Sequence, residues 1–211
     1  MERSLWKQGY NRVMGLDEAG RGCLCGPVVA AGVILDPHQP IRGLRDSKKV
    51  SQKERERMEV EIQKKALFWT VQRSEPEEID RINILRASLV AMDRCSREKT
   101  ANPDFLLIDG NRFGSSPIPY ECVIGGDDKS ASIAAASILA KVSRDRIMTR
   151  FHESYPHYGW NRNVGYPTAA HYKALQRYGY TPLHRKTFKL RTDRPCSSDN
   201  PLSDKTGSQQ S

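Results

Sequence analysis

Cysteines at metal-binding or disulfide spacing are missing from this sequence. Its five cysteines are an odd number, and no two of them form a C-x-x-C pair. This pattern argues against a structural zinc site and against a disulfide framework. We therefore expect buried or inert thiols in a reducing cytosol at Cys23, Cys25, Cys95, Cys122 and Cys196.

Long apolar segments are missing too. No stretch approaches the roughly 18 continuous apolar residues that a membrane-spanning helix requires. The first residues, MERSLWKQGYNRV, lack the apolar region of a secretory signal. These absences predict a soluble, cytoplasmic protein without a membrane partner.

Basic residues are in excess, with 34 Lys and Arg against 25 Asp and Glu and a net charge of +9. Such an excess favours a polyanionic partner such as nucleic acid, although many proteins are basic for solubility alone. Residues 191–211 are rich in Ser, Pro, Asp and Gln, which predicts a disordered C-terminal tail. Basic and acidic residues cancel within that tail, so the excess belongs to one domain over residues 1–190.

The apolar pattern predicts an α/β domain with a mixed central sheet flanked by helices. Apolar runs at 12–16 and 28–35 are joined by a Gly-rich stretch and are expected to pair as a hairpin. Further strands are expected at 66–72, 105–108 and 120–124.

Helix starts are indicated by two capping-box pairs, in which a Ser precedes a Glu by three residues. Ser51 with Glu54 opens one helix, and Ser74 with Glu77 is expected to open a single long helix that runs through Met92. A central helix over 132–150 and a last helix from about Thr168 are also expected.

Four acidic residues stand at the ends of apolar segments or in Gly-flanked loops: Asp17, Glu18, Asp109 and Asp127. A carboxylate beside a core strand is costly to bury unless it is paired or bound to a metal. Converging carboxylates repel one another unless a cation bridges them, and hard oxygen ligands suit Mg²⁺ or Mn²⁺. The alternative is that each is an ordinary turn residue or helix cap, as an Asp before a Gly often is.

Asp17 and Glu18 are neighbours, and neighbouring side chains on a regular strand point to opposite faces of the sheet. Flanking Gly15 and Gly20 would relax that restriction. Glu18 could also use its backbone carbonyl, or reach a second ion around the end of the strand. The sequence leaves these routes open.

Two further segments suit phosphate contacts. Gly20, Arg21 and Gly22 form a G-R-G loop that permits close backbone approach to a ligand and supplies a guanidinium group. Lys48 and Lys49 follow Asp-Ser just before a helix, where phosphate contact and ordinary helix capping are equally good explanations.

The segments GLDEAGRGCLCGPVVAAGVIL, LRDSKKVS, LLIDGNRF, GGDDKSASIAAASILAKVSRDR and NVGYPTAAHY follow one another in the chain. In these segments and their order, the sequence resembles the bacterial ribonuclease HII family over about residues 10–190. The first and fourth segments are long and highly specific. The resemblance implies a ribonuclease H-like fold with a C-terminal helical extension, in agreement with the strand order expected above.

The resemblance also implies roles for individual residues. The metal-binding and catalytic carboxylates would be Asp17, Glu18, Asp109 and Asp127, with Mn²⁺ or Mg²⁺ as cofactor. Asp127 is preferred to the neighbouring Asp128 because of its place in the G-D-x-K-S pattern.

Substrate contacts are implied in the same way. The loop of Gly20, Arg21 and Gly22 would contact the ribonucleotide 2′-hydroxyl, which distinguishes RNA from DNA. Lys48 would contact a phosphate, and Tyr166 would stack on the deoxyribose that follows the ribonucleotide.

Three other residues have family-like surroundings but are expected to be structural. Asp145, inside the K-V-x-R-D segment, is expected to pair with a neighbouring Arg. His171 and His184 are expected to be hydrogen-bonded structural residues, because a lone histidine is more often that than a catalyst.

The resemblance thus implies an endoribonuclease that hydrolyses the RNA strand of RNA–DNA hybrids and cuts 5′ of single ribonucleotides in duplex DNA. Two-metal-ion hydrolysis would leave 3′-hydroxyl and 5′-phosphate ends, with a role in DNA replication and repair, and the protein would act as a monomer. Ribonuclease HIII is a rival, but it carries a further N-terminal substrate-binding domain and usually a G-K-G-like loop, neither of which we find. A non-catalytic hybrid-binding module is the other alternative, although a phosphate binder has no use for clustered acids.

Overall fold

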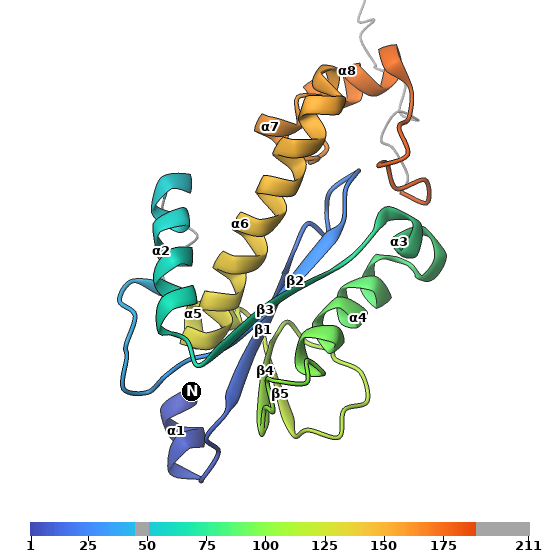
Figure 1. Cartoon of the computed structure of the whole chain (residues 1–211). Coiled ribbons are helices and arrows are strands. Elements are labelled where there is room, and N and C mark those ends of the chain that lie inside the picture. Colours follow the sequence, from blue (N-terminus) through green and yellow to red (C-terminus); the bar gives the residue numbers. More distant parts are fainter. Residues whose placement is uncertain (45–50, 189–211) are drawn as a thin grey trace, which may run out of the picture.

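The first two strands pair as the predicted hairpin within a five-stranded sheet (Figure 1). The computed structural model describes residues 1–44 and 51–188. Its strands lie in the spatial order β3-β2-β1-β4-β5. They are β1 Val13–Ala19, β2 Val28–Ile34, β3 Phe68–Ser74, β4 Phe105–Asp109 and β5 Tyr120–Val123. The predicted α/β class with a mixed sheet is therefore confirmed, and the third strand begins two residues later than expected.

Strand direction changes in the middle of the sheet. β1, β2 and β3 form an antiparallel meander, whereas β4 runs parallel to β1 and β5 runs parallel to β4. In the β1–β4 register Leu16 is opposite Ile108. Because this pairing is parallel, the next residues, Asp17 and Asp109, follow at the same edge of the sheet.

Helices cover both faces of the sheet (Figure 1). The helical elements are α1 Glu2–Lys7, α2 Gln52–Lys65, α3 Pro76–Ile82, α4 Ile84–Ser96, α5 Gly126–Lys129, α6 Ala131–Ser154, η2 Pro156–Tyr158, α7 Trp160–Asn163 and α8 Ala169–Tyr178. α2 and α6 pack with Ala31 and Val33 on one face, and α4 packs with Leu16 and Ile34 on the other.

The start of α6 lies directly against β1. A Cβ atom at Gly15 would be 2.2 Å from the carbonyl carbon of Ser132, so only glycine permits this approach. The predicted cap of α2 is confirmed, because the Ser51 side chain accepts from the Glu54 N–H.

The long helix expected from Ser74 through Met92 is wrong, because the segment forms two helices. Asn83 adopts a φ of 69° between them, and its side chain caps α4 by accepting from the Arg86 N–H. Ser74 ends β3 instead, where its buried hydroxyl donates to the carbonyl of Ala87. An Asn tolerates this backbone conformation, which explains the break.

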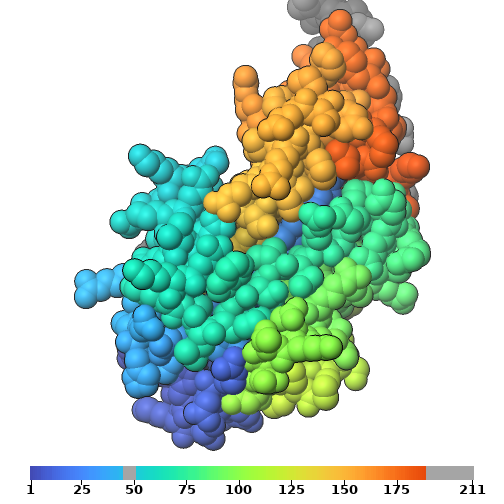
Figure 2. Space-filling model, in the orientation of Figure 1, coloured from blue at the N-terminus to red at the C-terminus, as the bar shows by residue number. Residues whose placement is uncertain are grey.

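The C-terminal elements form a lobe at the far end of α6 (Figure 2). Met148 of α6, Trp160 of α7 and Leu175 of α8 pack there against Leu24 and Cys25 of the loop between β1 and β2. Helices α7 and α8 are thereby packed against the loop that contains G-R-G.

Glu2 of α1 fixes the beginning of α6. Its buried Oε1 accepts hydrogen bonds from the Ser130 hydroxyl at 2.6 Å and from the N–H and hydroxyl of Ser132, both at 2.8 Å. Burial alone would raise the pKa of Glu2, but these hydrogen bonds outweigh it and lower that pKa. The ionised carboxylate therefore stabilises the N-terminus of α6.

Glu2→Ala is expected to lower the free energy of unfolding at pH 7 by about 2 kcal/mol, because it leaves buried donors unsatisfied. Since the folded pKa is lowered, the effect should be full above pH 4.5 and fade as pH falls through the folded value. Urea denaturation of both proteins at several pH values measures this. Glu61→Ala, which removes a partly exposed partner of Lys65, should change the free energy by less than about 0.5 kcal/mol.

Three predictions fall outside the described residues: the disordered tail over 191–211, the buried or inert thiol at Cys196 and the phosphate contact at Lys48 and Lys49. Within the described ranges, no helix has the length and apolar character needed to cross a membrane.

Candidate active site

Asp17 and Asp109 lie side by side where β1 and β4 end. The Asp17 side chain is buried, and its Oδ1 accepts from the N–H of Glu18 at 2.7 Å. Oδ1 of Asp109 accepts from the N–H of Gly126 at 2.7 Å, which ties β4 to the start of α5. The parallel register therefore brings together two carboxylates that are 92 positions apart in the chain.

These carboxylates repel one another. Burial raises the pKa of Asp17 well above its ordinary value, and the charges of Glu18 and Asp109 raise it further. Burial also raises the pKa of Glu18, with Asp109 adding to the effect and Arg21 opposing it. Asp17, Glu18 and Asp109 thus form one electrostatic cluster, which contains three of the four acids that the sequence predicts to converge.

Glu18 contacts the G-R-G loop. Its Oε1 accepts from Arg21 at 2.9 Å, and it lines a cleft of about 440 Å³ together with Ser137, Lys141 and Tyr166. Ser137, which was not predicted, also hydrogen-bonds the Asp17 side chain. The Glu18 carboxylate therefore faces the cleft at the end of the strand.

Asp127 lies in α5, directly after the residue that binds Asp109. Its side chain is only 2% exposed. The left-handed conformation of Gly125, with a φ of 63°, turns the chain from β5 into this short helix. Asp128, the neighbour that was set aside, is exposed.

The two glycines of the G-R-G loop differ in what they permit. Gly20 has a φ of 96°, and a Cβ there would be 2.0 Å from Nε of Arg144, so the fold itself requires glycine. A Cβ at Gly22 would meet no atom within 4 Å. The open space at Gly22 leaves the backbone accessible to a ligand.

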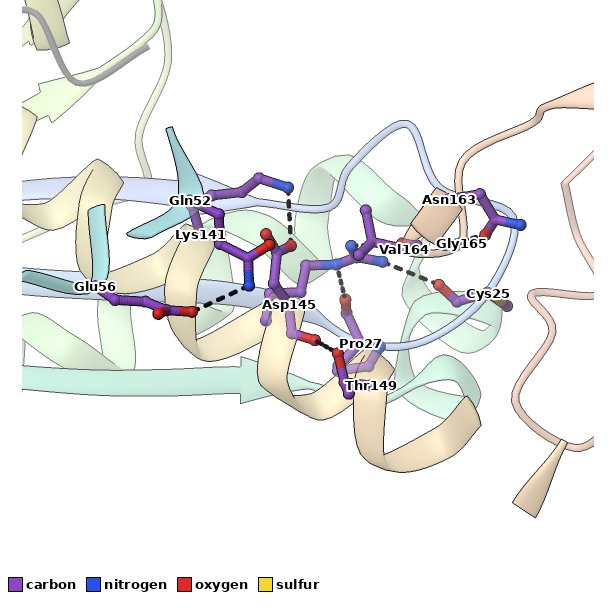
Figure 3. A network of polar contacts seen from close by, with 11 residues as sticks. Cys25, Pro27, Gln52, Glu56, Lys141, Asp145, Thr149, Asn163, Val164 and Gly165 are labelled. Carbon is purple, nitrogen blue, oxygen red and sulfur yellow. Dashed lines mark hydrogen bonds and ion pairs between the residues drawn. The ribbon is translucent and has the colours of Figure 1, made fainter. Parts of the chain in front are cut away.

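Arg144 of α6 holds this loop from the inside, a role that sequence reasoning missed. Its buried guanidinium donates to the carbonyls of Pro27 at 3.1 Å, Cys25 at 3.2 Å and Val164 at 2.8 Å (Figure 3). The first two carbonyls follow the G-R-G loop, and the third precedes Tyr166. One side chain thus joins the two loops at the cleft.

Tyr166 stands at the rim of the cleft with 41% of its surface exposed. Nζ of Lys141 lies 5.9 Å from its ring centroid, and the side chain hydrogen-bonds Cys23. Lys141 also pairs with Asp145 at 2.8 Å, one turn along α6 (Figure 3). The sequence analysis expected an arginine partner for Asp145. The ion pair that the described residues show is with a lysine of the same helix, because a side chain four residues away lies on the same face.

His171 and His184 are buried and hydrogen-bonded, and they form a pair that was not predicted, with 3.2 Å between their Nε2 atoms. Nδ1 of His171 faces the carbonyl of Tyr166 at 3.0 Å, and Nδ1 of His184 accepts from the N–H of Thr181 at 3.0 Å. His184 therefore carries its proton on Nε2 and donates to Nε2 of His171.

Cys25 completes a cluster of ligand-type atoms with these histidines, within 4.8 Å of one another. Burial raises the pKa of Cys25 far above the ordinary range, so the thiol stays protonated. Nε2 of His171 is also occupied by the N–H of Trp160 at 3.2 Å. The thiol and the ring nitrogens contact one another and Trp160, and His171 contacts the carbonyl of Tyr166, so the cluster supports the loop that carries Tyr166.

Acid is expected to weaken this pair. Burial lowers the pKa of both histidines, to about 4 for His184, where the charge of His171 lowers it further. Because the folded values are depressed, the stabilisation is complete above pH 6.5 and is lost as pH falls toward the folded values. The free energy of unfolding should fall by about 1.4 kcal/mol per pH unit for each histidine in this window.

Urea denaturation between pH 7 and pH 5 measures that slope. His184→Asn should flatten it, whereas replacing the exposed His38 by Ala should leave it unchanged. An equal slope in wild type and His184→Asn would contradict the burial argument.

The carboxylate cluster suits a divalent cation. Asp17 and Asp109 present oxygen atoms at one edge of the sheet, and burial and repulsion destabilise the charged form of Asp17 without a cation. A hard dication relieves that repulsion, and the oxygen-only donor set is the one that Mg²⁺ and Mn²⁺ prefer.

The sequence matches one family of known proteins. The sequence model of a family described as Ribonuclease HII matches residues 14–191. Ribonuclease HII of Dechloromonas aromatica is 54% identical over 176 residues, which cover 83% of this chain and 90% of that protein. Ribonuclease HII of Salinibacter ruber is 50% identical over 196 residues, which cover 91% of this chain and 98% of that protein.

A solved structure of the same family has a similar fold. The structure of the PCNA:RNase HII complex from Archaeoglobus fulgidus contains a chain that is 28% identical, with a TM-score of 0.72. The similarity covers 87% of this chain and 98% of that one.

Proposed function

We propose that this chain, which belongs to the ribonuclease HII family of nucleases, hydrolyses the RNA strand of RNA–DNA hybrids and cuts duplex DNA on the 5′ side of single embedded ribonucleotides. The products would carry 3′-hydroxyl and 5′-phosphate ends. Such cuts start the removal of ribonucleotides from DNA, so the protein would act in replication and repair. We further propose that it works in the cytoplasm as a monomer.

The observation that carries this proposal is the mutual repulsion of Asp17, Glu18 and Asp109 beside the cleft. A surface that only binds phosphates would gain nothing from buried negative charge, because that charge repels the nucleic acid. Carboxylates that a cation must bridge are what phosphodiester hydrolysis requires.

Asp17, Glu18, Asp109 and Asp127 would hold Mg²⁺ or Mn²⁺. When bound, these ions supply positive charge that stabilises the attacking and leaving oxygens of the phosphodiester. The hydrogen bonds from Ser137 to Asp17 and from Gly126 to Asp109 orient the carboxylates before the substrate arrives.

Substrate specificity would come from the residues of the cleft. The open backbone at Gly22 would admit the ribose 2′-hydroxyl, and Arg21 would exchange its bond to Glu18 for a contact with the sugar-phosphate backbone. The exposed ring of Tyr166 would stack on the following deoxyribose, where a second 2′-hydroxyl would be crowded. Lys48 would bind a phosphate.

A substrate panel tests the proposal. The protein is incubated with Mg²⁺ and with an RNA–DNA hybrid, a DNA duplex containing one ribonucleotide, an all-DNA duplex and single-stranded RNA. Cutting of the first two, with the all-DNA duplex left intact, is the expected result. Binding of the hybrid without cutting of any substrate would support a non-catalytic binding module instead.

A further inference from the structure

A second buried arginine, Arg185, comes from the segment that follows α8 and reaches the G-R-G loop. Only 1% of its surface is exposed. Its Nε donates to the carbonyl of Gly26 at 3.0 Å, and its Nη1 donates to the carbonyl of Arg21 at 3.0 Å. One guanidinium thus holds both ends of the loop from Arg21 to Gly26.

Main-chain hydrogen bonds add to this contact. The N–H of Arg185 donates to the carbonyl of Leu24 at 2.9 Å, and the N–H of Gly26 donates to the carbonyl of Leu183 at 2.8 Å. Cys25 and His184 form an antiparallel bridge between them. The C-terminal segment therefore lies along the loop like a short added strand.

The two buried arginines bind different carbonyls. Arg144 donates to the carbonyls of Cys25 and Pro27. Arg185 donates to the carbonyl of Arg21, the central residue of G-R-G. Burial lowers the pKa of Arg185 to about 10, so the side chain stays charged in a place where charge is costly. An apolar side chain could fill this space but could not fix the peptide that precedes Gly22.

We propose that Arg185 is a positioning residue, which sets the orientation of the peptide after Arg21 and so prepares the loop for the ribose of the substrate. This inference rests on the proposed function of the loop. Arg185 itself does not touch the substrate; it acts through the main chain of Arg21. Its loss should therefore weaken recognition of the ribonucleotide more than binding to the DNA around it.

The test compares Arg185→Ala and Arg185→Lys with wild type. Dissociation constants are measured by fluorescence anisotropy with a chelator present, for a DNA duplex with one ribonucleotide and for the same duplex without it. KM and kcat for cutting the first duplex are measured with Mg²⁺. We expect Arg185→Ala to lose at least about fivefold in preference for the ribonucleotide and to raise KM, because two charged hydrogen bonds to the loop are lost. All-DNA binding should change by less than about twofold.

Two control variants separate positioning from stability. Arg177→Ala removes an exposed arginine of α8 and should retain the wild-type preference. Met92→Ala creates a cavity in the core on the other face of the sheet and should lower Tm without changing the preference. Guanidinium ion at low concentration should partly restore the preference of Arg185→Ala for the ribonucleotide-containing duplex, and NaCl at equal ionic strength should not.

If Arg185→Ala does not fold, the positioning role is tested with Arg185→Lys, which keeps the charge without the planar fork.

The possible failures are distinguishable. A wild-type protein that cuts no ribonucleotide-containing duplex would overturn the proposed function. Wild-type preference and KM in a folded Arg185 variant would overturn only the positioning role. An equal loss of preference in Met92→Ala would reduce Arg185 to a general stabiliser and overturn that role as well.

Discussion

Asp17→Asn is expected to lower cutting of a ribonucleotide-containing duplex by about a thousandfold or more, while duplex binding is retained. The carboxylate that is proposed to hold the metal is lost, and several kcal/mol of transition-state stabilisation would be lost with it. Asn keeps an oxygen that can still accept from the N–H of Glu18, so the end of β1 should keep its conformation.

Asp17→Asn should lower activity but raise the stability of the metal-free protein. Because the folded pKa of Asp17 is raised, the metal-free wild type loses stability as pH rises from 3.8 through that folded value. Asn removes this repulsion, so the metal-free variant should have a higher Tm than metal-free wild type at pH 7. Mg²⁺ or Mn²⁺ should raise the Tm of the wild type by binding the folded state, and should raise that of the variant less.

Single-turnover cleavage, anisotropy and differential scanning calorimetry measure these effects. Asp93→Asn is the matched control, because Asp93 is a surface acid of α4 that pairs only with Arg97 among the described residues. It should behave as wild type in all three measurements. Lost duplex binding by a folded Asp17→Asn protein would contradict the role of Asp17 in hydrolysis.

Tyr166→Ala should reduce cutting at a single embedded ribonucleotide by about tenfold and cutting of a continuous RNA–DNA hybrid by less. The ring is half exposed at the cleft rim, and a tenfold loss of the proposed stacking on a sugar would correspond to about 1.4 kcal/mol. The backbone of Tyr166 is held by His171, so truncation of the side chain should leave the loop in place.

Cleavage rates for both substrates give the selectivity ratio that tests this role. Tyr166→Phe should keep the ratio, because it retains the ring. Tyr178→Ala removes a tyrosine with similar exposure, 43%, from α8 and should change neither rate. Equal rate losses on both substrates in Tyr166→Ala would argue for a general binding contact and against junction selection.

Much of the fold could be predicted because local patterns agreed with the final packing. The hairpin of β1 and β2 followed from two apolar runs joined by glycines, and the cap of α2 followed from Ser51 and Glu54. Asp17 and Asp109 could be picked out from local signals, since each acid follows the apolar run of a buried strand, and the parallel register of β1 and β4 then brings them together.

The errors and omissions came from contacts between distant segments. Ser74 has the local sequence pattern of a helix cap, but it lies at the end of β3, where its hydroxyl donates to the carbonyl of Ala87. The segments K-V-S-R-D-R and L-H-R-K led to no prediction for Arg144 or Arg185. Their burial depends on main-chain carbonyls of a loop more than 100 residues earlier, for which the sequence holds no local signal.

Mapping the cut in a DNA duplex that contains one ribonucleotide is the most direct test of hydrolysis at the Asp17–Asp109 edge. The wild-type protein should make one cut on the 5′ side of the ribonucleotide when Mg²⁺ or Mn²⁺ is present, leaving a 3′-hydroxyl and a 5′-phosphate, and should make no cut when a chelator is added. An intact duplex with both metals, or an equal cut in the presence of the chelator, would contradict a metal-dependent carboxylate site.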